Sequence, residues 1–242
     1  GLGELFPEVG VEENELNRQL VQAEFNFILR EYQKAEEILD KIDSTLLIEP
    51  RQHWYYDYLK GYVIALKKGT TAEAFFYFNR IIDEAPKEEM EILVLLAYTG
   101  MGILYENIGE IQKAEYFFNK AITDVYRYPI KETHDIWRLL NIMYYCGSFY
   151  ANIEDYQTSD ALLTHGVKIC SDNHVTYYLA RMTFQLAKNA VAQNKDCYEI
   201  MDLYYSTKAY AEINKNMIEL KALEDFKHEL MENDAFSEIV LY

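Results

Sequence analysis

The sequence predicts an all-α protein built from consecutive helix hairpins. Gly102 and Gly147 are each followed by large and small residues in the same order and at the same offsets. Self-similarity at a period of about 20–50 residues is the mark of a helical repeat array. The 242 residues include only 4 prolines and 10 glycines, and no Ser/Gly/Pro-rich linker divides them. We therefore predict a single repeat domain over residues 1–242.

The matching offsets are explained by the packing of two helices. The residues at these offsets are Tyr105, Gly109, Ile111, Ala114, Phe118 and Ala121 after Gly102, and Tyr150, Glu154, Tyr156, Ser159, Leu163 and Gly166 after Gly147. A glycine on the first helix lets the second helix approach closely, and Phe118 fills the space between them. Ala114 and Ala121 form the crossing point. Gly109 is expected to take a positive φ and to end the first helix.

The same pattern marks five hairpins in order along the chain. The five hairpins are expected at about residues 14–49, 50–86, 87–129, 130–172 and 174–212, and a capping helix is expected at 213–232. The first hairpin is a weaker match, with Ala23 in the glycine position. The second has Gly61 there and Phe78 as the filling side chain. The fifth is degenerate, and we assign Ala187 to its glycine position.

This pattern resembles the tetratricopeptide repeat. The signature of that family is an aromatic residue, a Leu–Gly pair and a Tyr, followed by Ala, Phe, Ala and Pro. The closest match, residues 95–129, has Tyr98, Met101–Gly102, Tyr105, Ala114, Phe118, Ala121 and, late, Pro129. The resemblance covers about residues 14–212. It implies a right-handed superhelical array whose first helices line a concave binding groove.

The net charge of −17 is concentrated at the two ends of the chain. Residues 1–50 carry 12 acidic and 4 basic residues, and residues 201–242 carry 9 and 4. Polar capping faces of a repeat array explain this distribution. A functional explanation is that an acidic end contacts a basic partner domain. Either way, so acidic a chain repels phosphate backbones and is not expected to bind nucleic acid by itself.

The sequence predicts a cytoplasmic protein without membrane contact. No stretch reaches the ~18 unbroken apolar residues of a membrane span, and no signal peptide is visible. The three cysteines, Cys146, Cys170 and Cys197, form no CxxC motif and are odd in number, which is typical of reduced thiols. Cys146 precedes Gly147 on the packed face, so we expect it to be buried.

Motifs for catalysis are lacking. The five histidines show no metal-ligand spacing. The sequence has neither a glycine-rich phosphate loop nor a GxSxG motif. Carboxylates are abundant, but they lie on solvated helix faces. We therefore predict no enzymatic activity, no cofactor and no metal ion.

A peptide-binding surface is the better prediction. In the tetratricopeptide family, the groove is lined by the face of each first helix that points away from the second. The positions that we predict to bind a peptide are Tyr55, Tyr58, Tyr62, Thr99, Ile103, Glu106, Asn107, Asn141, Tyr144, Ser148, Asn152, Arg181, Phe184 and Lys188. Asn107 and Asn152 occupy equivalent places, and a carboxamide can pair with both the N–H and the C=O of a peptide backbone. Tyrosines add contact area with a polar tip.

These positions also have structural explanations. An asparagine near a helix end is often a cap or a turn former. The row of Tyr55, Tyr58 and Tyr62 is also compatible with ordinary packing between repeats. Arg181 and Lys188 are candidates to anchor a ligand's carboxylate, but exposed helix charges usually bind nothing specific.

The overall pattern resembles the C-terminal region of Rgg/PlcR-type transcriptional regulators of Gram-positive bacteria. It shares with them about five irregular repeats, rich in Tyr and Asn, and an acidic final helix. The Lys/Asn set of chaperone-binding tetratricopeptide proteins is absent from the best three hairpins. The resemblance implies a short linear peptide in the groove, a homodimer, and DNA contact only through a helix-turn-helix domain. Residues 1–50 do not resemble that domain, so we expect it to lie upstream of this chain.

Three functions stay open at this point. The favoured one is a peptide-sensing domain of a quorum-sensing regulator. A constitutive interaction scaffold is the second, and it predicts a co-purifying partner and no response to short peptides. The third is a phosphatase or hydrolase built on repeats, whose turnover would depend on a groove carboxylate such as Glu106. Residues 1–15 leave no room for the three-helix bundle of the related aspartyl-phosphatase sensors.

Overall fold

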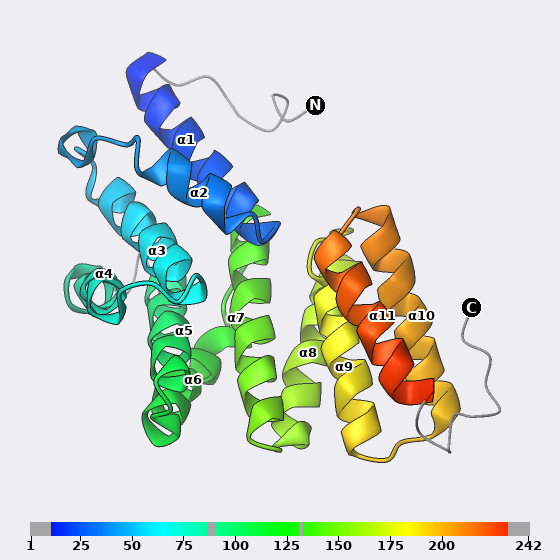
Figure 1. Ribbon diagram of the computed structural model, residues 1–242. Helices are drawn as coiled ribbons and strands as arrows, with labels where there is room; N and C mark the ends of the chain where they lie inside the picture. The colour runs from blue at the N-terminus through cyan, green and yellow to red at the C-terminus, as the bar shows by residue number, and fades with distance from the viewer. Residues whose placement is uncertain (1–10, 87–90, 131–132, 232–242) are drawn as a thin grey trace. The chain divides into compact units, whose positions relative to one another are not determined.

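The structure is a computed structural model that describes residues 11–86, 91–130 and 133–231 (Figure 1). Within these ranges it contains eleven α-helices, one short 3-10 helix (Ser44–Leu46) and no strand. The α-helices are α1 (Val11–Ile28), α2 (Tyr32–Leu39), α3 (Pro50–Leu66), α4 (Thr71–Glu84), α5 (Glu91–Asn107), α6 (Ile111–Val125), α7 (Thr133–Asn152), α8 (Tyr156–Asp172), α9 (Leu179–Ala192), α10 (Cys197–Ile213) and α11 (Met217–Met231). The prediction of an all-α chain of consecutive helix hairpins is confirmed. No helix in the described ranges is long and apolar enough to cross a membrane.

The chain divides into two compact units, residues 1–121 and 122–242. In the N-terminal unit, α1 packs against α2 and α3 against α4, and α3 also contacts α1 and α5. In the C-terminal unit, α7 packs against α8 and α9 against α10, and α11 lies against both α9 and α10 (Figure 1). The single array over residues 1–242 stays a prediction.

Seven helices end in the same hydrogen-bonded turn. In each, the second residue after the helix has a positive φ; these residues are Arg30, Lys68, Gly109, Glu154, His174, Asn194 and Lys215. The following N–H donates to a carbonyl in the last turn, as from Glu110 to Tyr105 at 2.9 Å. Such bonds satisfy carbonyls that the helix leaves open. Gly109 has a φ of 79°, which confirms the prediction made for it.

This turn predicts opposite effects at two equivalent positions. Glu154 holds a φ of 65°, which is unfavourable for any residue with a Cβ atom, whereas Gly109 tolerates its φ of 79°. We expect Glu154→Gly to raise the free energy of unfolding by about 0.5–1 kcal/mol and Gly109→Ala to lower it by about 1 kcal/mol. Urea unfolding followed by circular dichroism measures both changes. Shifts of the same sign would contradict this account of the turn.

Glycines on first helices make room for large side chains of second helices, as the repeat pattern predicts. A Cβ atom placed on Gly102 would lie 2.8 Å from three atoms of the Phe118 ring. A Cβ atom on Gly147 would lie 2.8 Å from Cγ of Leu163. Both distances are shorter than real Cβ contacts, so the close helix approach depends on the missing side chain.

Phe78 of α4 occupies the tightest of these contacts. Its buried ring lies between two glycines, because a Cβ atom would come within 2.6 Å of it from Gly61 and within 2.2 Å from Gly100. Gly61 belongs to α3 and Gly100 to α5. One aromatic ring therefore sets the spacing of three helices in the N-terminal unit.

The cysteines are predicted to differ in reactivity. No disulfide joins Cys146, Cys170 or Cys197, and the buried Cys146 confirms the prediction made for it. Burial raises the pKa of the Cys170 thiol to about 12, and only the thiolate reacts readily. In the native protein we expect a water-soluble thiol reagent to modify the half-buried Cys197 first and Cys170 only after unfolding. Peptide mass spectrometry reads the order, and equal rates would refute it.

Candidate functional site

The predicted tyrosine row of the N-terminal unit lies largely in the core. Tyr58 and Tyr62 of α3 are only 1% and 0% exposed. Their rings meet edge to face at 5.2 Å, and the Tyr62 hydroxyl donates to the carbonyl of Leu96 at 2.8 Å. The half-buried Tyr55 stacks on Tyr58 and donates to the buried carboxylate of Glu24. For Tyr58 and Tyr62 the burial therefore supports packing between repeats rather than an open groove.

The predicted residues of α5 become more accessible toward its end. Thr99 is fully buried and its hydroxyl donates to the carbonyl four residues earlier, while Ile103 is 5% exposed. These two side chains belong to the core. Glu106 is half-buried and Asn107 is exposed. The Asn107 amide donates to the carbonyl of Ala65 in the last turn of α3 at 3.1 Å, so it bridges two first helices instead of capping its own.

Four predicted residues share one face of α7 in the C-terminal unit: Asn141, Tyr144, Ser148 and Asn152. Asn141 is 1% exposed, Tyr144 and Ser148 are half-buried, and Asn152 is exposed. The Asn141 Nδ2 donates to the Tyr178 hydroxyl at 3.4 Å. Among the described atoms, neither Oδ1 of Asn141 nor Oγ of Ser148 has a hydrogen-bond partner. A buried polar atom without a hydrogen-bond partner costs about 1–3 kcal/mol.

Arg181 of α9 contacts a carboxylate of its own chain. Its side chain is 3% exposed, and its Nε lies 3.7 Å from Oε1 of Glu219 on α11. The guanidinium also lies over the Tyr178 ring, 5.0 Å from the ring centre. The carboxylate of Glu219 is an internal partner for Arg181 in this structure, so the anchoring of a ligand carboxylate by Arg181 stays a prediction.

The other two predicted residues of α9 have different surroundings. Phe184 is half-buried and meets Phe226 of α11 edge to face at 5.5 Å, so it helps to seat α11. Lys188 is exposed, and its Nζ lies 5.0 Å from the centre of the Phe184 ring. Of the two, Lys188 is the side chain that a ligand could reach.

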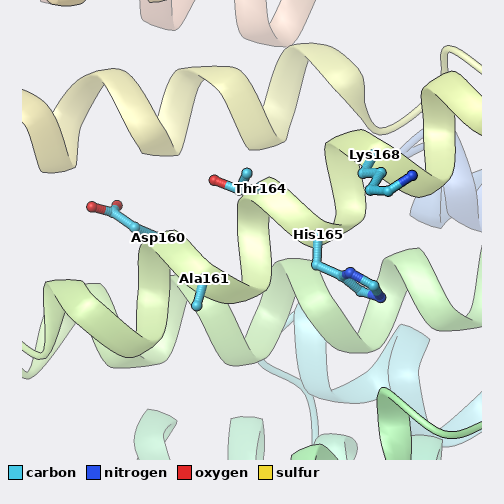
Figure 2. A pocket seen from close by; sticks show the side chains of 5 residues that line it. All are labelled: Asp160, Ala161, Thr164, His165 and Lys168. Atoms are coloured by element: carbon cyan, nitrogen blue, oxygen red, sulfur yellow. The ribbon is translucent and has the colours of Figure 1, made fainter.

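A shallow hollow of about 450 Å³ lies on α8 (Figure 2). The lining residues all come from this helix: Asp160, Ala161, Thr164, His165 and Lys168. Its charged groups are engaged, since Asp160 accepts from the amides of Asn189 and Gln193 at 2.8 and 2.9 Å, and Lys168 pairs with Asp172 at 2.6 Å. The lining offers no nucleophile and base in contact, which nucleophilic catalysis requires. In the described ranges, no three His, Cys, Asp or Glu side chains are grouped to hold a metal ion.

A buried polar network joins α8 and α9 and reaches a carbonyl of α7; the sequence analysis did not predict it. Ser159 Oγ donates to the Gly147 carbonyl at 2.7 Å, and Asn189 Nδ2 donates to Ser159 Oγ at 2.8 Å. Gln185 Nε2 donates to Asn189 Oδ1 at 2.9 Å. Buried networks with satisfied partners favour one geometry. The sequence did contain a signal for it, because Gln185 and Asn189 of α9 and Gln193, which follows the helix, are spaced four residues apart.

Comparison with known proteins supports the fold. No family model matches the chain, and no curated protein matches it. Among solved structures, the chain is similar to PlcR of Bacillus thuringiensis, crystallised in complex with the peptide PapR7 and DNA. The TM-score is 0.75 and the match covers 89% of this chain and 76% of the PlcR chain, at 12% sequence identity. At that identity the likeness shows the fold alone, and it confirms the architectural resemblance predicted from the sequence.

Proposed function

We propose that this chain is the peptide-sensing region of a cytoplasmic transcriptional regulator of the quorum-sensing type. The fold is similar to that of PlcR, whose crystal structure contains a peptide and DNA. A shared fold does not by itself establish a shared function, so the chemistry of the site has to support the proposal. In this proposal the regulator is a homodimer, and it contacts DNA through a helix-turn-helix domain outside this chain.

The α7 face is the observation that carries the proposal. Asn141 Oδ1 and Ser148 Oγ are buried polar atoms without a hydrogen-bond partner among the described residues. An extended peptide supplies N–H donors and C=O acceptors in alternation, so its backbone can satisfy both. Tyr144 lies between them on the helix and adds apolar contact area. Asn152 continues the face toward solvent.

Burial and packing contacts together separate the predicted residues into two roles. In our proposal Tyr144, Ser148, Asn152 and Lys188 of the C-terminal unit touch the peptide, and Glu106 and Asn107 are the accessible positions of the N-terminal unit. Asn141 is 1% exposed, so in our proposal its oxygen meets the peptide only after the conformational shift that binding favours. The others hold the helices in place: Tyr55, Tyr58, Tyr62, Thr99, Ile103, Arg181 and Phe184. Binding would shift a pre-existing conformational equilibrium by the difference in the peptide's affinity for the two states. A coupling of about 1–3 kcal/mol would be enough to switch a dimer's affinity for DNA.

Calorimetry of asparagine variants tests the site. Synthetic hydrophobic peptides of about five to ten residues are titrated into the wild-type chain, and the best binder is used for the variants. We expect Asn107→Ala and Asn152→Ala each to weaken binding by about 1–3 kcal/mol if their amides pair with desolvated backbone groups. Asn79→Ala, an exposed amide on α4, is the matched control. Unchanged affinity in both groove variants would remove these residues from the site.

A further inference from the structure

The C-terminal helix α11 is held on α9 by two kinds of contact. The ring of Phe226 packs edge to face on Phe184 at 5.5 Å. The second contact joins charged groups, because Glu219 and Arg181 are 3% and 4% exposed and their nearest atoms are 3.7 Å apart. A buried ion pair adds little net stability, but losing one partner leaves an uncompensated charge. The seating of α11 is therefore sensitive to where the Arg181 guanidinium lies.

A continuous series of contacts connects this pair with the α7 face. The guanidinium of Arg181 lies over the Tyr178 ring. The hydroxyl of the same ring accepts the hydrogen bond from Asn141 Nδ2, and Tyr144 packs beside it at 6.4 Å. Tyr178 itself is fully buried. A side chain enclosed in this way transmits a displacement of its hydroxyl end to the Arg181 guanidinium, which lies over its ring.

We infer that Tyr178, Arg181 and Glu219 couple the α7 face to α11, so that a ligand group bound by Asn141 changes how firmly α11 is held on α9. The inference rests on the proposed function for the nature of that ligand group, a peptide N–H. The Asn141 amide has two ends. One donates to the Tyr178 hydroxyl, and the other, Oδ1, is buried and has no hydrogen-bond partner in the part of the chain that the structure describes. A donor that engages Oδ1 reorients the amide and moves Tyr178 beneath the guanidinium. In this way α11 becomes the responsive element of the C-terminal unit.

Hydrogen exchange of the peptide-free protein tests the coupling by a double-mutant cycle. Asn141→Ala removes the amide, and Arg181→Met with Glu219→Leu replaces the ion pair by apolar side chains. We expect Asn141→Ala to speed exchange of the α11 amides, residues 217–231, by about two- to tenfold in the wild-type background, since contacting networks couple by about 0.5–3 kcal/mol. In the apolar background, the same substitution should leave these amides unchanged.

Two controls separate the coupling from general loosening. Gln157→Ala removes an exposed amide of α8 that is not assigned to the site, and it should leave α11 exchange unaltered. If the protein with Arg181→Met and Glu219→Leu does not fold, Glu219→Gln serves as the second background. Unaltered α11 exchange in Asn141→Ala, or an equal increase in every background, would overturn the inference. Because no peptide is present, this result is independent of whether the peptide titration succeeds.

Discussion

Replacing Phe78 with alanine is expected to lower the free energy of unfolding by about 3–5 kcal/mol. The ring is fully buried, and it lies against Gly61 and Gly100 so closely that neither position has room for a Cβ atom. It also meets Tyr62 edge to face at 5.5 Å. Its removal opens a cavity where α3, α4 and α5 converge, and the glycines on both sides cannot fill it. Urea unfolding monitored by circular dichroism measures the loss.

Two further variants identify the cause of that loss. Phe76→Ala removes the same side chain from an exposed position on α4 and should cost less than about 1 kcal/mol. Gly100→Ala overpacks the intact ring and is expected to cost about 1–3 kcal/mol. In the Phe78→Ala background the new methyl group has space, so its cost should vanish. Additive effects of Gly100→Ala and Phe78→Ala would show that the close contact between the Phe78 ring and Gly100 does not set the helix spacing.

The second large effect is expected from Arg80→Met, which should cost about 3–5 kcal/mol at neutral pH. Asp57 is fully buried on α3, and Arg80 of α4 binds its carboxylate through two nitrogen atoms. Burial raises the pKa of Asp57, and the hydrogen bond and charge of Arg80 oppose that rise. Methionine keeps the aliphatic stem but leaves the carboxylate without its counter-charge. Denaturant unfolding at several pH values follows the result.

The sign of the pH dependence follows from the raised pKa of Asp57. A carboxyl group with a higher pKa in the folded state destabilises the protein above its unfolded pKa of about 3.9, and this loss disappears as the pH falls below that value. The cost of Arg80→Met should therefore shrink toward acid. Asp57→Asn combined with Arg80→Met removes the charge and should restore most of the lost stability at neutral pH. A penalty that is the same in acid and at neutral pH would contradict this explanation.

The sequence predicted the contacts between the two helices of a hairpin, because these contacts depend on local residue spacing. Gly102 and Phe118 contact each other as their offsets require, and Gly109 ends its helix with a positive φ. The other turns were not predicted, because Lys68 and Glu154 take the same conformation without being glycine. Their φ values are set by the hydrogen bonds of the turn, which the identity of the residue does not reveal.

The candidate site was predictable only in part. The helical period places Asn141, Ser148 and Asn152 on one face of α7, as expected from their spacing. Periodicity does not tell which part of a face a neighbouring helix covers, and Tyr62 is buried because α1, α4 and α5 surround it. The contact of Arg181 with Glu219 joins helices that are distant in the chain, so no local pattern signals it.

Native mass spectrometry of the purified chain with a mixture of synthetic hydrophobic peptides, each of about five to ten residues, shows whether the α7 face binds a short peptide. We predict a one-to-one complex that Asn152→Ala and Ser148→Ala weaken, while Gln157→Ala, an exposed amide on α8, leaves it intact. Retention of no peptide, or equal retention by all of these variants, would contradict the claim.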